Sequence, residues 1–306
     1  ALGDVISEDD NTAVGYNALL VNTADDNTAV GSQSLDANVG GSQNVAVGTN
    51  ALGTNISGDN NTAVGNLALR VNTADINTAV GSAAMHDNSS GTANTAVGRS
   101  ALYANTTADH NTAVGYAALT ANTTGAQNTA VGSAALSANT TGLWNIAVGY
   151  AALTANTTGY SNTAVGRTAL DANTEGFWNT AVGTGSLGAN ITGDENTAVG
   201  TAALSLNTGD DNTAVGSQAL EANSSGTQNT AVGMSALTAN TTADNNTAIG
   251  YASLDANTTG TSNTAVGRMS LSAVVSGDDN VAVGTNALVV NTASDNTAVG
   301  SLSLDA

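Results

Sequence analysis

The sequence contains no cysteine, no proline and no lysine, and only 9% of its residues are charged. Without cysteine there is no disulfide framework, although this absence does not define a cellular compartment. Four arginines stand against 24 acidic residues, which gives a formal net charge of −20. Such a surface repels phosphate backbones and anionic lipids. We therefore expect no nucleic acid among its partners and no insertion into a membrane.

The sequence also lacks the features of a transmembrane segment or an active site. No run of 18 apolar residues occurs, and no charged segment followed by an apolar one opens the chain. Only His86 and His110 could act as a base near neutral pH, and both occupy variable positions of a repeat. No nucleophile, base and orienting group recur together, and no glycine-rich loop has the context of a phosphate-binding motif. We predict that the protein is not an enzyme.

What the sequence has in abundance is one motif, NTAVG. Its eighteen copies, four of them with one conservative change, begin at Asn11, Asn27, Asn44, Asn61, Asn77, Asn94, Asn111, Asn128, Asn145, Asn162, Asn179, Asn196, Asn212, Asn229, Asn246, Asn263, Asn280 and Asn296. Thirteen of the seventeen steps between copies are 17 residues long and four are 16. So strict a period indicates one small structural unit stacked on itself.

A period of this length excludes repeats built from pairs of helices, which need about 33 residues or more. Short strands punctuated by glycine at a fixed period are typical of a β-solenoid. We predict an all-β fold, a parallel β-solenoid in the form of a two-layer β-roll, with about 18 coils of 16–17 residues. Residues 1–306 are expected to form a single continuous array, with both ends falling in the middle of a repeat.

Counting each coil from its first asparagine gives the pattern N-T-A-V-G-x-x-A-L-x-A-N-T-T-G-x-x. Position 4 is Val or Ile and position 9 is Leu or Met in every copy. We predict these two as the core, represented by Val14, Leu19, Val114, Leu119, Val148 and Leu153. Strand alternation then places position 11 inside with position 9, and positions 10 and 12 outside. In the four 16-residue coils position 11 is Val or Leu, which we interpret as bulk that restores packing inside a shorter coil.

Four further positions predict contacts between coils or between chains. The asparagines at positions 1 and 12 are expected to form ladders of side-chain amides along the stack, although asparagine is also a common turn former. Ala at position 3 and Gly at position 5 never vary. If Val at position 4 points inward, these two small residues point outward, where close approach of another backbone would explain them. We therefore expect a homo-oligomer, either a trimer or a laterally or end-to-end associated filament.

Candidate binding residues occur where the variable positions carry aromatic or arginine side chains. Positions 16 and 17 hold Leu143, Trp144, Tyr160, Phe177 and Trp178 in three successive coils, and position 6 holds Arg99, Tyr116, Tyr150 and Arg167. Exposed apolar patches commonly mark contacts, and Arg beside Tyr adds cation–π attraction. A cell-surface glycan, a receptor or a neighbouring fibre would bind here. The alternative is random variation at solvent-exposed positions.

The same corner of other coils carries acidic residues. Asp194, Glu195, Asp210 and Asp211 fall one coil apart, and carboxylate oxygens at this density suit Ca²⁺. The alternative is a solvated acidic loop without metal. No other cofactor is expected.

The NTAVG-x-x-A-L units, such as residues 111–119, resemble the tandem repeats of phage tail-fibre and surface-fibre proteins. The Ala-Val-Gly segment also resembles the Ala-Ile-Gly repeats in the heads of trimeric autotransporter adhesins. The resemblance covers nearly the whole chain. It implies a left-handed parallel β-roll with three chains side by side.

These observations predict an extracellular structural protein, a fibre of a cell surface or a virion that attaches to a host or another surface. One alternative is a self-assembling surface filament without a receptor. Another is an ice-binding β-solenoid, which needs an outward-facing ladder of threonine side chains. Thr at position 2 shares the face of Val at position 4, which is predicted to point inward, so the sequence argues against ice binding.

Overall fold

The computed structural model describes residues 10–290 and 293–304. The chain divides into two compact units, residues 1–158 and 159–306, each of which is described by itself. The first unit contains strands β1 (Thr12–Val14), β2 (Thr28–Val30), β3 (Val45–Val47), β4 (Thr62–Val64), β5 (Thr78–Val80), β6 (Thr95–Val97), β7 (Thr112–Val114), β8 (Thr129–Val131) and β9 (Ile146–Val148). The second contains β10 (Thr163–Val165), β11 (Thr180–Val182), β12 (Thr197–Val199), β13 (Thr213–Val215), β14 (Thr230–Val232), β15 (Thr247–Ile249), β16 (Thr264–Val266), β17 (Val281–Val283) and β18 (Thr297–Val299). The described residues contain no helix.

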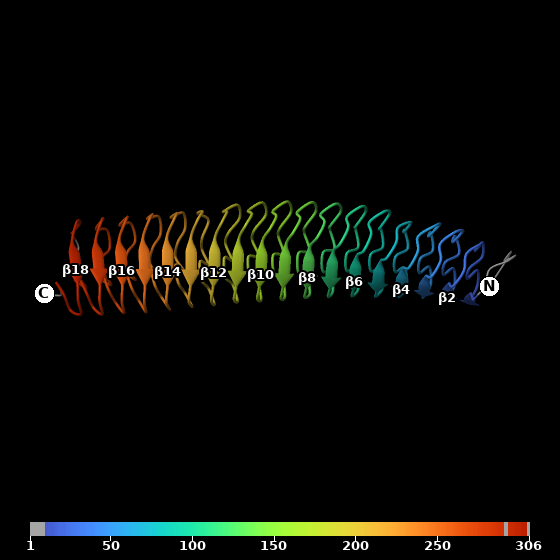
Figure 1. The fold of residues 1–306 in the computed structure, drawn as a ribbon, viewed down its shortest axis with the longest axis horizontal. Helices are drawn as coiled ribbons and strands as arrows, with labels where there is room; N and C mark the ends of the chain where they lie inside the picture. The colour runs from blue at the N-terminus through green and yellow to red at the C-terminus, as the bar shows by residue number, and fades with distance from the viewer. Residues whose placement is uncertain (1–9, 291–292, 305–306) are drawn as a thin grey trace. The chain divides into compact units, whose positions relative to one another are not determined.

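Within each unit, every strand pairs in parallel with the strand of the next coil. The register joins equivalent residues, as in Thr112↔Thr129, Ala113↔Ala130 and Val114↔Val131. Figure 1 shows the strands of each unit side by side and pointing the same way, each followed by the loop that leads to the next. The predicted all-β parallel β-solenoid is confirmed.

Each coil turns through residues with left-handed backbone conformations at positions 7, 9 and 17. In the coil that begins at Asn111 these are Ala117 (φ 54°), Leu119 (φ 51°) and Gln127 (φ 59°). Non-glycine residues adopt this region infrequently, and a repeated set of them is maintained only by the surrounding structure. Here the backbone hydrogen bonds to the neighbouring coils provide that support, for example from Leu119 N–H to Ala135 O at 3.0 Å.

Glycine at position 5 is required by a fourth unusual conformation and by close packing between coils. Gly166 has φ 140°, and a Cβ atom built on it would lie 2.5 Å from the carbonyl oxygen of Gly183 in the next coil. The invariance of this glycine is therefore explained by the adjacent coil of the same chain. It no longer supports association with a second chain.

The core differs from the predicted one at position 4. Leu19, Leu119 and Leu153 are fully buried as predicted, and their neighbours at position 8 are also buried. Val14 is 58% exposed and Val148 is 37% exposed, and Val114 is only half-buried. Their assignment to the core was wrong.

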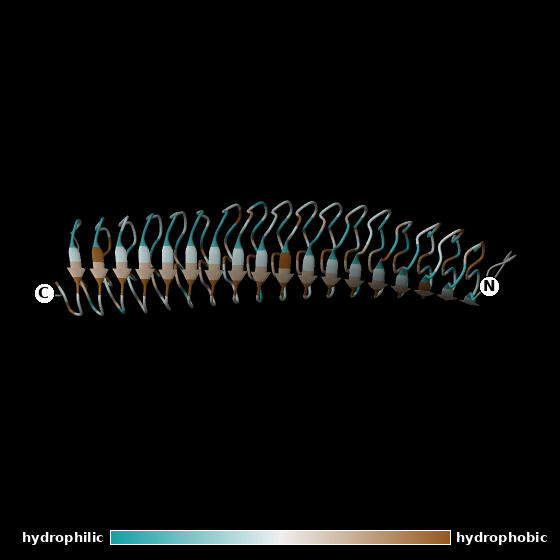
Figure 2. Ribbon diagram, viewed as in Figure 1, coloured by the Kyte–Doolittle hydropathy of each residue, from teal (hydrophilic) through white to brown (hydrophobic). Residues whose placement is uncertain are grey.

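The alanine at position 3 takes the place predicted for that valine, because Ala113 and its equivalents in strands β2 to β18 are almost completely buried, whereas Ala13 in β1 is half-buried. Strand alternation places positions 1 and 3 inside and positions 2 and 4 outside. In Figure 2 most strands change from a pale colour at their beginning to brown at their end, in keeping with the residue order Thr, Ala, Val.

The prediction for positions 11 and 12 was also wrong. Val21 and Leu206, at position 11 of two short coils, are 45% and 56% exposed, whereas Asn122 at position 12 is fully buried. The bulky residues of the short coils therefore do not restore internal packing, and nothing in the structure explains their presence. The short coils lack one residue of the turn after position 12. In one short coil, Asn72 Nδ2 therefore donates a hydrogen bond to the carbonyl of Ala74, only two residues further along the chain, at 2.8 Å.

Both asparagine positions form ladders, as predicted. At position 12 the amide nitrogen donates to the amide oxygen of the preceding coil, as from Asn139 to Asn122 at 2.8 Å. At position 1 the backbone N–H donates to the preceding side-chain oxygen, as from Asn128 to Asn111 at 2.9 Å, while Asn128 Nδ2 donates to Gly142 O at 2.8 Å. Because buried amides must be hydrogen-bonded, these ladders hold consecutive coils in register.

Candidate functional site

One exposed feature of each unit is the outer face of its sheet, formed by the side chains at positions 2 and 4; we call this the sheet face. These positions contain only Thr, Val and Ile, so the face carries no charge. The threonine hydroxyls at position 2 of the described strands make no hydrogen bond to the protein, as at Thr95 and Thr112. Where threonine is replaced, Val45 and Ile146 keep a β-branched side chain and are 37% and 43% exposed.

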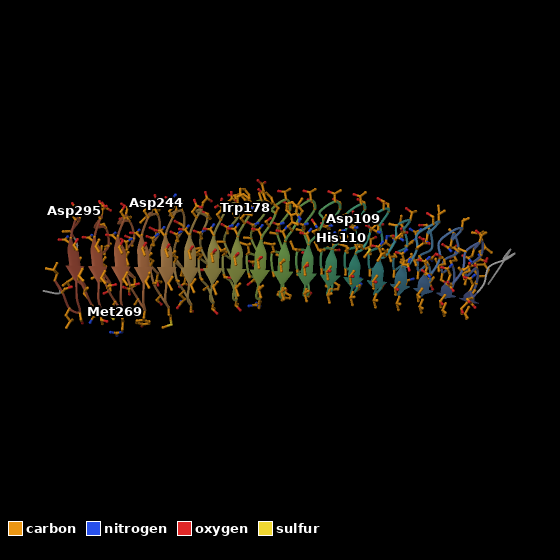
Figure 3. All side chains as sticks on the ribbon, viewed as in Figure 1. Asp109, His110, Trp178, Asp244, Met269 and Asp295 are labelled. Atoms are coloured by element: carbon orange, nitrogen blue, oxygen red, sulfur yellow. The ribbon has the colours of Figure 1, made fainter. Side chains whose placement is uncertain are left out.

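A second feature lies at the corner that precedes the strands in the unit of residues 159–306. The ring of Tyr160 stacks on that of Phe177, with centroids 4.9 Å apart and planes 8° apart. Trp178 meets Phe177 edge-on, at 5.0 Å and 90°, and also contacts Tyr160 at 6.1 Å. Figure 3 shows Trp178 projecting from this edge of the unit, whereas Met269 projects from the opposite edge. The structure therefore brings together three of the five aromatic-corner residues predicted from the sequence.

The other two, Leu143 and Trp144, belong to the unit of residues 1–158. The Trp144 side chain is 56% exposed, and its indole N–H donates a hydrogen bond to the Gln127 side chain of the preceding coil. Leu143 is half-buried.

The acidic residues Asp194, Glu195, Asp210 and Asp211 continue the same corner into the next two coils. Oδ1 of Asp194 accepts a hydrogen bond from the backbone N–H of Phe177 at 2.9 Å, and Oδ1 of Asp210 accepts one from Asp194 N–H at 2.9 Å. Together with Tyr160, Phe177 and Trp178, these four residues form what we call the aromatic–acidic patch.

The same corner arrangement recurs where threonine precedes aspartate. Asp244 Oδ1 accepts from both the backbone N–H and the hydroxyl of Thr227, at 2.7 and 3.1 Å. An aspartate at position 16 therefore accepts a hydrogen bond from the coil before it, a role that was not predicted from the sequence. Within the described residues, no three His, Asp or Glu side chains are arranged to hold a metal ion.

Partial burial raises the pKa of the Asp194 carboxyl above its ordinary value of 3.8. The hydrogen bond from Phe177 N–H opposes this shift, and the charges of Asp210 and Asp211 add to it. The carboxylates of Asp194, Asp210 and Asp211 are therefore close enough to repel one another. A ligand carrying positive charge would relieve this repulsion.

The predicted residues at position 6 form one pair within the first unit. The guanidinium of Arg99 lies 5.8 Å from the ring centroid of Tyr116, a cation–π contact that the sequence predicted. Tyr150, in the same unit, is 57% exposed, and Arg167, in the other unit, is also exposed.

Two further pairs of this kind were not predicted from the sequence. Arg268 lies 5.9 Å from the ring centroid of Tyr251, and His86 stacks on Tyr103 at 5.0 Å. In each pair the residues occupy the same position of consecutive coils, so comparison of neighbouring coils would have found them.

No known protein-family model matches the chain, and no curated protein is significantly similar to it. In the described part of the chain, no helix has the length and hydrophobicity needed to cross a membrane.

Proposed function

We propose that the protein is an extracellular structural protein, a fibre in which copies of the β-solenoid pack against one another through their sheet faces. The columns of side chains beside that face remain available for attachment to a host or another surface. The observation that carries this proposal is the outward-facing valine at position 4. Valine occupies this position in every coil except one, where Ile249 replaces it, and in the described coils the side chain is exposed or half-buried.

The chemistry of the sheet face suits packing between protein surfaces. A continuous exposed apolar surface commonly marks an interaction site, and the centre of a protein interface is depleted of charge. The chain has a net charge of −20, yet positions 2 and 4 carry none of its charged residues. The charges are therefore placed where they prevent aggregation by other faces while leaving this one free to associate. The resemblance to trimeric fibre repeats favours three copies.

The experiment compares the native chain with two charge-matched variants of the first unit. Val97→Asp, Val114→Asp and Val131→Asp together place three charges on the sheet face. Thr107→Asp, Thr124→Asp and Thr141→Asp place three charges at position 14, where Thr124 is exposed. We expect light scattering to show an oligomer for the native chain and the position-14 variant, and a monomer for the sheet-face variant. Circular dichroism checks that both variants fold.

The proposal of self-association fails if the native chain is monomeric at high concentration. It fails equally if the sheet-face variant keeps the native oligomeric state.

A second candidate function, ice binding, gains support because the threonine column faces outward, contrary to the sequence-based prediction. Regularly spaced hydroxyls without protein partners, beside rigid β-branched methyl groups, can order a layer of water. Thermal hysteresis of the monomeric fraction, lost in the sheet-face variant, would support this function over self-association. A native oligomer without thermal hysteresis would exclude it.

A further inference from the structure

The aromatic–acidic patch contains side chains that the fold of the corner does not need. Other coils build the same turn with Thr or Asp at position 16 and Gln, Asn or Asp at position 17. Their position-17 residues have the same left-handed conformation, for example Gln228 at φ 58° against Trp178 at φ 56°. Because the turn forms without aromatic rings, burial within the coil does not explain Tyr160, Phe177 and Trp178.

The rings are arranged so that two aromatic planes meet at a right angle. Phe177 and Tyr160 are parallel and stacked, and Trp178 stands at 90° to Phe177. The Trp178 side chain remains 54% exposed despite both contacts. The faces of aromatic rings carry negative electrostatic potential, so an exposed ring in such a corner attracts a cation.

Carboxylates occupy the coil next to the one that carries Phe177 and Trp178, and two of its residues contact the Phe177 backbone. The Asp194 carboxylate is bonded to the backbone N–H of Phe177 at 2.9 Å, and Glu195 N–H donates to Phe177 O at 3.1 Å. No lysine or arginine occupies position 16 or 17 of any coil, so the repeat supplies no cation to this corner. The patch therefore combines aromatic faces with carboxylates that the chain leaves unneutralised.

The geometry points to a binding site for an organic cation, an ammonium group carried by a partner molecule. Trp178 and the neighbouring rings contact the cation, and the carboxylates of Glu195 and Asp211 balance its charge. Residues 1–306 contain no lysine, so none of their side chains in a second copy provides an ammonium group. This inference rests on the proposed function and names a class of ligand for its adhesive surface. Ligand binding is measured on the dissolved protein, whereas self-association is measured by light scattering, so failure of one is distinguishable from failure of the other.

The test uses Trp178 as the reporter in a Trp144→Gln background, where the substitution copies Gln127 and Gln228 at the same position. Choline is titrated against tryptophan fluorescence, in parallel with 3,3-dimethylbutan-1-ol, which has the same shape without the charge. Nα-acetyl-lysine amide tests a primary ammonium group of the kind that a protein partner would present. We expect saturable changes with one or both cations and none with the alcohol. The cation that binds more tightly identifies the source.

Two variants separate the roles of the rings and the charges. The first variant combines Tyr160→Ser with Phe177→Thr, because Ser and Thr occur at position 16 of other coils and the net charge is preserved. Loss of the rings should weaken binding about fivefold. Glu195→Gln with Asp211→Asn should also weaken binding. Asp279→Asn with Asp295→Asn removes the same charge at position 17 of other coils and should leave binding unchanged.

Equal binding of the uncharged alcohol, or no response to either cation, would overturn the inference. So would an equal loss of binding in both acidic variants, because the effect would then reflect net charge alone.

Discussion

Asn139 donates a 2.8 Å hydrogen bond from its amide nitrogen to the amide oxygen of Asn122 in the preceding coil, and both side chains are fully buried. Asn122 in turn donates to Asn105 Oδ1 at 3.1 Å and to Gly125 O at 2.9 Å. One side chain thus joins three coils and closes its own turn. The interior of the solenoid is stabilised by polar ladders as well as by apolar packing.

Asn122→Ala should destabilise the first unit by at least about 2 kcal/mol, because it leaves several buried polar groups without their partners. Thr124→Ser is the control, since Thr124 is exposed and Ser225 occupies the same position of another coil. Hydrogen exchange should show faster opening of the coils on either side of Asn122. Native protection in the alanine variant would mean that the ladder contributes little.

Leu119→Ala should cost about 2–5 kcal/mol, as expected for removal of a fully buried leucine. Val114→Ala should cost about 1 kcal/mol or less, because its side chain is only half-buried. Urea unfolding of the two variants measures the difference. Similar losses of stability in the two variants would show that Val114 belongs to the core. They would contradict the assignment of position 4 to the outer face of the strand.

Gly166→Ala should destabilise the second unit strongly. The backbone conformation at φ 140° costs a residue with a side chain about 1–3 kcal/mol, and the new Cβ would also collide with the carbonyl of Gly183.

Gly185→Ala is the matched control for Gly166→Ala. Gly185 has φ 63° with no atom near a Cβ, and Ala202 adopts φ 56° at the same position of the next coil. Thermal unfolding should separate the two variants clearly. Equal melting temperatures would show that the close contact between coils can relax.

The protein should be more stable near pH 4 than at pH 7. Burial raises the pKa values of Asp36, Asp171, Asp194 and Asp255 above 3.8. A raised pKa in the folded state means that the native protein binds more protons than the unfolded chain. The stabilisation is then complete below pH 3.8 and is lost as pH rises through the raised values.

Melting temperatures measured across this pH range test the sign of the effect. Asp36, Asp171 and Asp255 occupy position 10, where another coil has Thr120. Replacing all three by Thr should flatten the pH dependence of the melting temperature. A melting temperature that rises from pH 4 to pH 7 would contradict the prediction.

The repeat by itself determined the fold class, the length of the coil, the buried leucine and the asparagine ladders. These follow from periodicity and from the requirement that stacked identical coils place identical side chains next to each other. Comparison of consecutive coils also predicted the contact of Arg99 with Tyr116 and grouped Tyr160, Phe177 and Trp178.

Only the tertiary structure decided which side of the three-residue strand faces inward. The strand has alanine at position 3 and valine at position 4, and the larger apolar side chain was predicted to lie in the core. The coil is closed by left-handed turns at positions 7, 9 and 17, and its interior is filled by leucine, two asparagines and small side chains. Alanine fits beside them, and strand alternation then turns valine and threonine outward together. That outcome depends on the width of the closed coil, which no single repeat in the sequence reveals.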